Sequence, residues 1–249
     1  MLRLENKVAV ITGAASGFGE GMARRFAEEG AKVVVADLNS KGAERVAGEI
    51  GEAALPVTAD VTMAADIERM VAACMEKFGR LDVMVNNAGY SHRNGPLTEV
   101  DETILDLITA VNMKAIYHTA RLVVPIMERQ GGGSIITTAS TAGLRPRPGL
   151  TWYNASKGWT ITATKSMAVE LAPKNIRVNC LCPVAGDTPM LATFMGEDTP
   201  EKRAQFRASI PLGRLSMPLD VANAALWLAS DEAAFITGVA LEVDGGRCI

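Results

Sequence analysis

The chain has 249 residues, with 48% hydrophobic and 21% charged residues, so it can bury a large core and is not expected to be disordered. The formal net charge is −3 and no long basic run occurs, so the sequence predicts no binding to nucleic acid or to an anionic membrane. No apolar run reaches the roughly 20 residues of a membrane span, and the first predicted strand leaves no room for a signal peptide. We therefore expect a cytoplasmic protein.

Short apolar runs alternate with longer helical patterns along the chain. Strands are predicted at residues 8–11, 32–36, 54–58, 81–85, 134–138, 177–181 and 239–243. Helices are predicted at residues 17–29, 41–50, 64–78, 102–130, 152–171 and 219–230, with Pro125 at a kink or in the last turn of the longest. Strands that are apolar throughout indicate a parallel sheet covered on both faces. The pattern predicts a single α/β domain over residues 1–249, a doubly wound Rossmann domain with a seven-stranded parallel sheet.

The stretch 183–214 departs from this alternation. It is rich in Pro, Gly and Thr, and one helix is predicted in its middle. A long insertion after the carboxyl end of a strand is more often functional than not. We expect residues 184–214 to act as a substrate lid, in which Met190 belongs to an apolar patch.

A glycine-rich turn joins the first strand to the first helix, with the sequence TGAASGFG at positions 12–19. Such a turn lets backbone N–H groups approach a pyrophosphate, and the helix N-terminus adds partial positive charge. A dinucleotide site is therefore predicted, although glycine turns also occur in ordinary strand–helix units. The predicted contacts are Gly13, Ser16, Gly17, Phe18 and Gly19.

Asp37 ends the second predicted strand. A carboxylate there can accept hydrogen bonds from the ribose hydroxyls and would repel a 2′-phosphate, and no Arg or Lys stands at position 15 or 38. The sequence thus predicts NAD rather than NADP, with a solvated turn aspartate as the alternative. Asp60 and Val61 follow the third strand, and either cap a helix or reach the adenine.

Further motifs follow later strands: Asn86-Asn87-Ala88-Gly89, then Asn112, Ser140 and Tyr153-x-x-x-Lys157. Together with the glycine turn they resemble the short-chain dehydrogenase/reductase family over nearly the whole chain, and within it the 3-oxoacyl-ACP reductase and glucose 1-dehydrogenase group. The resemblance implies that the segment 86–89, including Asn87, Ala88 and Gly89, lines the cofactor and stabilises the sheet. It also implies that Asn112 holds a water that links Lys157 to solvent.

Physical chemistry explains why a Tyr, a Lys and a Ser would suit proton transfer at this site. A free tyrosine, with a pKa near 10, is a poor base at neutral pH. Lys157 lies one helical turn after Tyr153, and its charge is expected to lower the pKa of the phenol. Ser140 ends a strand and can donate to a developing oxyanion. A buried Tyr, a surface Lys and a capping Ser are the structural alternatives.

The sequence departs from the family pattern in three places. Phe18 replaces a small aliphatic residue, Val184 replaces the glycine that usually follows Pro183, and Gly186 replaces a β-branched residue. The resemblance places this segment against the nicotinamide amide, with Thr188 in register as a contact.

Charged and aromatic residues stand in the loops expected around the reacting carbon. An anionic group on the substrate would suit an arginine there, and solubility or a subunit contact is the alternative. The candidate substrate residues are His92, Arg93, Arg145, Arg147, Trp152 and Met190.

Cys180 and Cys182 share one face of a predicted strand, and we interpret them as a reduced buried pair. No metal site is predicted, because no histidine or second cysteine pair lies near them.

The sequence thus predicts an NAD-dependent oxidoreductase that transfers hydride between a nicotinamide and a secondary alcohol or ketone. Its substrate would be a small molecule such as a sugar, polyol or hydroxy acid, and the family resemblance implies a homotetramer. One alternative is a 3-oxoacyl-thioester reductase, although that role usually prefers NADPH. A non-catalytic dinucleotide sensor or scaffold is the alternative of another class.

Overall fold

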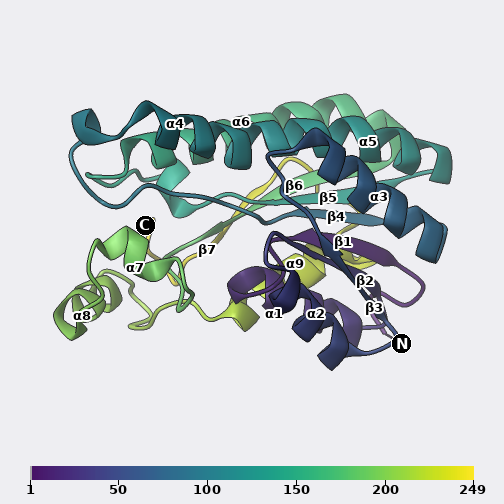
Figure 1. The fold of residues 1–249 in the computed structure, drawn as a ribbon, viewed down its shortest axis with the longest axis horizontal. Helices are drawn as coiled ribbons and strands as arrows, with labels where there is room; N and C mark the ends of the chain where they lie inside the picture. The colour runs from purple at the N-terminus through teal and green to yellow at the C-terminus, as the bar shows by residue number, and fades with distance from the viewer. Residues whose placement is uncertain (1) are drawn as a thin grey trace.

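A seven-stranded parallel sheet forms the centre of the computed structural model, which describes residues 2–249 (Figure 1). Its strands lie side by side in the order β3-β2-β1-β4-β5-β6-β7. They are β1 (Val8–Thr12), β2 (Lys32–Asp37), β3 (Ala54–Thr58), β4 (Val83–Asn86), β5 (Gly133–Thr138), β6 (Ile176–Pro183) and β7 (Ala240–Val243). The order reverses between β1 and β4, which is where doubly wound sheets bind their ligands. The predicted fold class is confirmed.

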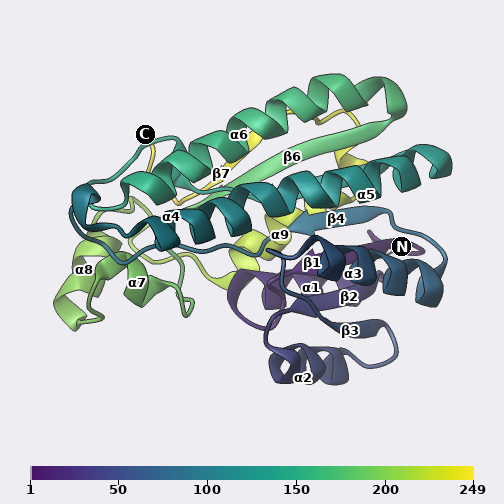
Figure 2. The same cartoon turned by 45° about the horizontal axis from the view of Figure 1, so that its top comes forward.

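Helices cover both faces of the sheet, as Figures 1 and 2 show. One face carries α1 (Gly17–Glu28), α2 (Ser40–Ile50) and α9 (Pro218–Ala229), and the other carries α3 (Ala64–Phe78), α5 (Ala115–Gln130) and α6 (Thr151–Leu171). Each layer buries an apolar cluster against the strands, with Phe26 of α1 on one side and Met70 of α3 on the other. None of the helices in residues 2–249 has both the length and the apolar character needed to cross a bilayer.

Burial explains the apolar strands. Every residue of β1 is buried, and so are the four residues Val33 to Ala36 of β2. The edge strands β3 and β7 are only half-buried, and β3 holds Pro56, which lacks the N–H that an inner strand needs. The sequence pattern therefore reflects position in the sheet.

The prediction of one continuous helix at 102–130 is wrong, because the helix is interrupted. The structure divides it into α4 (Glu102–Thr109), a π-helical turn (Ala110–Lys114) and α5, with Pro125 inside α5. π-turns insert one extra residue and are frequent at functional sites. This turn contains Asn112.

The stretch after β6 contains two helices rather than the one predicted, α7 (Leu191–Met195) and α8 (Pro200–Ala208). They lie beyond the carboxyl edge of the sheet (Figures 1 and 2). Buried Leu191, Met195 and Ile210 form a small apolar cluster of their own there. This segment therefore packs as a separate lobe over the edge where the site lies.

Candidate active site

The carboxyl edge of the sheet opens into a cavity of about 1000 Å³. A cavity of this size is at the upper end of typical ligand pockets. It is lined by all of the predicted catalytic and cofactor residues except Gly19 and Asn112. The lining members of the prediction are Gly13, Ser16, Gly17, Phe18, Asp37, Asp60, Val61, Asn87, Ala88, Gly89, Ser140, Tyr153, Lys157, Pro183, Val184, Gly186 and Thr188.

The glycine turn is built for close approach. Gly13 has a φ of 64°, and a Cβ on it would lie 2.9 Å from the Cα of Ala88. A side chain on Gly19 would collide with the carbonyl oxygen of Gly13, which explains why Gly19 closes the turn without lining the cavity. Ser16 precedes α1, and its hydroxyl does not cap that helix. The turn therefore fits a pyrophosphate, with the N-terminus of α1 and a free hydroxyl facing the cavity.

Asp37 is fixed at the end of β2. Its two carboxylate oxygens accept hydrogen bonds from the backbone N–H groups of Ala15 and Asn39, both at 2.9 Å. Sequence reasoning missed Arg45, which donates to the carbonyl oxygen of Ala15 at 3.1 Å from the next helix. Arg45 is paired with Glu20 at 2.8 Å, so its charge is already compensated.

Asn87 ties three strands together beside the cavity. Its Nδ2 donates to the carbonyl oxygens of Thr12 and Gly13, and its Oδ1 accepts from Thr138 Oγ1 at 3.1 Å. Asp60 instead holds its own turn, because its Oδ1 accepts from both the N–H and the hydroxyl of Thr62. Asp60 does not cap the next helix, because the N-cap residue of α3 is Met63, and Asp60 lines the cavity.

Two of the departures from the family pattern compensate each other. A Cβ on Gly186 would come within 2.7 Å of Phe18 Cε1, and closer still to Cζ. The bulk gained at position 18 therefore occupies the space that the missing side chain leaves at position 186. This contact joins the glycine turn to the loop after β6, and both residues line the cavity.

Tyr153 and Lys157 project from the same face of α6, as their spacing predicts. Both are about 5% exposed, and the Lys157 Nζ lies 5.7 Å from the centre of the Tyr153 ring. The ammonium donates to the carbonyl oxygen of Thr138 at 2.8 Å. Ser140, at the end of β5, accepts a hydrogen bond from the N–H of Ala142 at 3.1 Å. Thus β5 and α6 together hold the three groups at one cavity wall.

The electrostatics of this pair differ from the expectation. Burial raises the pKa of Tyr153 to about 12, and the Ser140 hydroxyl only partly opposes this effect. Burial also lowers the pKa of Lys157 to about 8. In the protein alone, loss of hydration dominates the pKa of the phenol, and Lys157 is not among the groups that shift it. At neutral pH the phenol therefore holds its proton and is a donor.

Asn112 acts through the chain around it. Its Oδ1 accepts from the N–H of Tyr90 and its Nδ2 donates to the carbonyl oxygen of Tyr90 and to Ser156 Oγ, all at 2.9 Å. The side chain thus locks the π-turn to the loop after β4 and to α6. A small cavity of about 10 Å³ is lined by Asn112, Lys157 and Thr138, among others. This is close to the minimum space for one water molecule.

Of the six candidate substrate residues, Arg147 and Met190 line the large cavity. The other four are placed elsewhere by local bonds: His92 Nδ1 bonds the carbonyl oxygen of Arg93, Arg93 donates to Gly196, Arg145 to Arg247 and Ile249, and Trp152 to Leu97.

The lining also contains Phe206 and Arg247, which sequence reasoning did not single out. Phe194, which belongs to the apolar patch expected after Thr188, lines the cavity too. Arg247 is 100 residues from Arg147 in the chain, and only folding brings them to one cavity.

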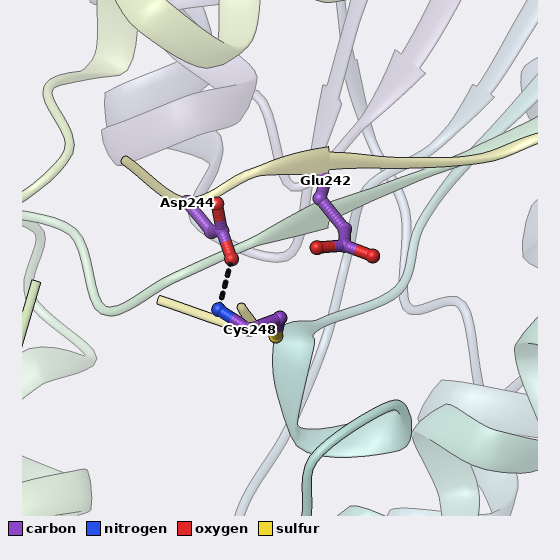
Figure 3. Close-up of side chains that lie close together, drawn as sticks. All are labelled: Glu242, Asp244 and Cys248. Atoms are coloured by element: carbon purple, nitrogen blue, oxygen red, sulfur yellow. Dashed lines mark hydrogen bonds between the residues drawn. The ribbon is translucent and has the colours of Figure 1, made fainter. Parts of the chain in front are cut away.

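The cysteines are all free thiols, and Cys180 and Cys182 are completely buried. Within residues 2–249, one group has metal-ligand geometry, formed by Glu242, Asp244 and Cys248, whose ligand atoms lie within 4.8 Å of one another (Figure 3). Both Asp244 oxygens accept backbone hydrogen bonds, from Gly246 and Cys248. The cluster is therefore explained as a turn that fixes the tail.

A Rossmann sheet with a glycine turn and a Ser, Tyr and Lys set at its carboxyl edge defines a class of nicotinamide-dependent oxidoreductases. Comparisons with known proteins agree. Residues 13–247 match a family model described as "Enoyl-(Acyl carrier protein) reductase". The chain is 48% identical to 4-formylbenzenesulfonate dehydrogenase TsaC1/TsaC2 of Comamonas testosteroni and 41% identical to 3-oxoacyl-[acyl-carrier-protein] reductase FabG of Thermotoga maritima, with complete coverage of both chains in each case.

Solved structures give the same result. A 3-ketoacyl-(acyl-carrier-protein) reductase from Brucella melitensis, complexed with NADH, superposes with a TM-score of 0.94 at 52% identity, covering 99% of this chain and 100% of the other. The chain belongs to the short-chain dehydrogenase/reductase family. It is an oxidoreductase that acts on CH–OH or keto groups. The non-catalytic alternative is therefore wrong.

Proposed function

We propose that the protein transfers hydride between NAD and an alcohol or carbonyl carbon, with Tyr153 as the acid and base. The observation that carries the proposal is the position of Tyr153 and Lys157 in the same cavity as the glycine turn and Asp37. The bound nicotinamide supplies or accepts the hydride. Gly13, Ser16 and Asp37 would hold the pyrophosphate and the adenosine ribose, and Thr188 the amide.

The residues of the chain handle the proton. In the reducing direction, Tyr153 donates its proton to the carbonyl oxygen as negative charge develops there, and Ser140 donates a hydrogen bond to the same oxygen. In the oxidising direction, Tyr153 must lose its proton first. The buried ammonium of Lys157 and the water-sized cavity between Lys157 and Asn112 support a path by which that proton is exchanged with solvent.

NAD is favoured over NADP by Asp37. Its carboxylate is held by two backbone N–H groups and faces the cavity, so a 2′-phosphate would meet a fixed negative charge. Arg45, the guanidinium that reaches this turn, already has Glu20 as a partner.

The direct test is Tyr153→Phe, which removes one oxygen. We expect kcat to fall by about 10²- to 10⁴-fold, the usual contribution of general acid–base catalysis, while the Kd for NADH changes by less than about threefold. Absorbance at 340 nm reports turnover, and titration of NADH fluorescence reports binding. Retained turnover in the variant would refute the assignment.

Reduction of a 3-oxoacyl thioester is the second candidate. Two relatives carry that activity in their names, and one of them was solved with NADH, so Asp37 alone does not exclude it. The first-mentioned relative instead acts, by its name, on an aldehyde that bears a sulfonate. Comparison of kcat/KM for acetoacetyl-CoA and for aromatic aldehydes, with NADH, decides between the two.

We further propose a homotetramer in a reducing compartment, consistent with the cytoplasm. Free Cys74, Cys180, Cys182 and Cys248 support the compartment. Exposed Tyr117 on α5 and Trp159 on α6 support an interface on that layer of helices.

A further inference from the structure

Two arginine side chains in the cavity lack a counter-ion. Arg147, in the loop before α6, and Arg247, in the tail after β7, both line the cavity that contains Tyr153. Within residues 2–249 neither forms an ion pair, whereas Lys202, also in the lining, pairs with Glu197 at 3.4 Å. Arg203 and Arg214, outside the lining, pair with aspartates.

The few contacts of these two guanidinium groups are with neutral atoms. Arg147 is half-buried, lies 5.3 Å from the centre of the Phe206 ring, and reaches Ser209 Oγ only at 3.4 Å. The Nε of Arg247 is buried and has no hydrogen-bond partner. An unpartnered buried donor on a charged group is unfavourable, and native structures normally satisfy it with a partner, a water or a ligand.

Like charges gather at this point. Burial lowers the pKa of Arg147, the positive charges of Arg247 and Arg145 lower it further, and Cys248 opposes them. Arg145 is itself engaged, because it donates to the carbonyl oxygens of Arg247 and Ile249 and so holds the tail in place. Arg147 is also anchored, since its carbonyl oxygen accepts from Asn154 Nδ2 at 2.8 Å. The fold therefore brings Arg147 and Arg247 to one cavity, and within residues 2–249 neither has an acidic side chain in ion-pair contact.

Aromatic side chains of the lid connect this region to the catalytic tyrosine. The Phe194 ring lies 5.2 Å from the Tyr153 ring, and Phe206 lies against Arg147. Both phenylalanines, with Met190 and Met195, line the cavity. The walls thus offer an apolar surface between polar groups of two kinds: a proton donor and a pair of cations.

We propose that Arg147 and Arg247 form a subsite for an oxyanion of the substrate, and that the substrate is a small organic carboxylate or sulfonate with an apolar, ring-sized body. The reacting carbon faces Tyr153, and the anion lies away from it, on the two guanidinium groups. The identity of the reacting carbon rests on the proposed function, but binding of the anion does not. The phosphate of a longer thioester substrate could bind the same two guanidinium groups. The test below distinguishes such a phosphate from an organic carboxylate or sulfonate.

The test measures binding without turnover. Calorimetry on the full-length protein saturated with NADH compares benzoate, benzenesulfonate, neutral benzamide and inorganic phosphate. We expect the two organic anions to bind at least about tenfold more tightly than benzamide and phosphate, because a hydrogen bond to a charged group contributes roughly this factor or more. Arg147→Met and Arg247→Met should each weaken the organic anions by about ten- to a hundredfold and leave benzamide unchanged.

The matched control is Arg207→Met, on the exposed end of α8 and outside the lining, which removes the same charge and should change nothing. NADH affinity confirms that each variant is folded. Equal binding of benzoate and benzamide, or preference for phosphate, would overturn the proposal. So would variants that lose oligomer mass in light scattering but keep their anion affinity.

The two proposals fail separately. If the anions bind as expected but no alcohol or carbonyl compound is turned over, the proposed function is wrong and the subsite stands. If turnover is found but the anions bind no better than benzamide, the subsite alone is wrong.

Discussion

Tyr153 and Lys157 show how burial decides the properties of single residues. The spacing of the pair places both on one face of α6, but spacing does not reveal how little water reaches them. Loss of hydration favours the neutral form of each group, so the pKa of the phenol rises while that of the ammonium falls. The pair is thus held with the phenol protonated, ready to donate.

Burial of Lys157 makes stability depend on pH. Its pKa falls from 10.5 to about 8 on folding, so between these pH values the unfolded chain binds a proton that the folded chain does not. The free energy of unfolding should therefore rise from pH 8 towards pH 10, by up to about 3 kcal/mol in total. Above pH 10 the raised pKa of Tyr153 acts in the opposite direction, because the unfolded chain then loses its proton first.

Urea unfolding of the wild type and of Lys157→Met at pH 7.5, 8.5 and 9.5 measures this dependence. The difference between the two proteins should shift in favour of the wild type as pH rises, since the methionine has no proton to lose. If the free energies of unfolding of the two proteins change in parallel with pH, the pKa of Lys157 is not lowered by folding.

Asp37 is expected to set the choice of dinucleotide. The double change Asp37→Ser with Leu38→Arg removes the negative charge and adds a guanidinium at an exposed position of the lining. The ratio of kcat/KM for NADP to that for NAD should rise by at least about tenfold, since charged hydrogen bonds to a phosphate contribute that much. A wild type that already prefers NADP would contradict the role given to Asp37.

At the scale of elements, most bounds could be predicted. The helices over α1, α2, α3, α6 and α9 lie within one residue of prediction, since apolar periodicity and the buried strands fix them. The π-turn at Ala110–Lys114 could not, because its apolar pattern continues that of the flanking helices. Its cause is tertiary: the side chain of Asn112 bonds both backbone groups of Tyr90.

Local sequence patterns also failed to predict two contacts between distant parts of the chain. The sequence marked Phe18 and Gly186 as separate departures, and only the folded chain shows that one fills the space of the other. Arg147 and Arg247 are likewise joined by the fold alone. In contrast, Asp37 could be predicted from its place at the end of a strand, and Ser140, Tyr153 and Lys157 from the motifs by which the sequence resembles its family.

The contact between Phe18 and Gly186 predicts a reciprocal pair of substitutions. Gly186→Val should raise KM for NAD by about tenfold or more, because overpacking of 1–3 kcal/mol would push Phe18 into the cofactor space. The backbone of Gly186 is not in the left-handed region; besides Phe18, an added Cβ would lie 3.0 Å from Ser216 Oγ, so that hydroxyl must also shift slightly. Adding Phe18→Leu should restore KM. A double variant no better than Gly186→Val alone would show that the two residues are not coupled.

For the whole molecule, the sheet separates two tasks. The half of the chain up to β4 contributes the glycine turn and Asp37, and the half after it contributes Ser140, Tyr153 and the segment 184–214. The helices α5 and α6 meanwhile present aromatic side chains outward, with Trp159 38% and Tyr117 53% exposed. Large exposed aromatic groups of this kind are typical of surfaces that are covered in an oligomer.

A tetramer should therefore depend on this layer. Light scattering should give a mass four times that of the 26.4 kDa chain for the wild type, and half of that or less for Trp159→Asp, since a buried unpaired carboxylate is costly. Met63→Asp, which places the same charge at an exposed apolar position before α3, is the control and should stay tetrameric. An unchanged mass in Trp159→Asp would move the interface elsewhere.

Cys180 and Cys182 can report how often the folded protein opens. Both sulfurs are sealed beneath α6, and the neighbouring Cys180 together with burial raises the pKa of Cys182. A thiol-labelling reagent can reach these two cysteines and the buried Cys74 only in molecules that have opened, whereas Cys248 is only partly buried. The rate constant of the slow labelling phase thus reports opening of the sheet. A dinucleotide that binds the closed form should lower this rate constant.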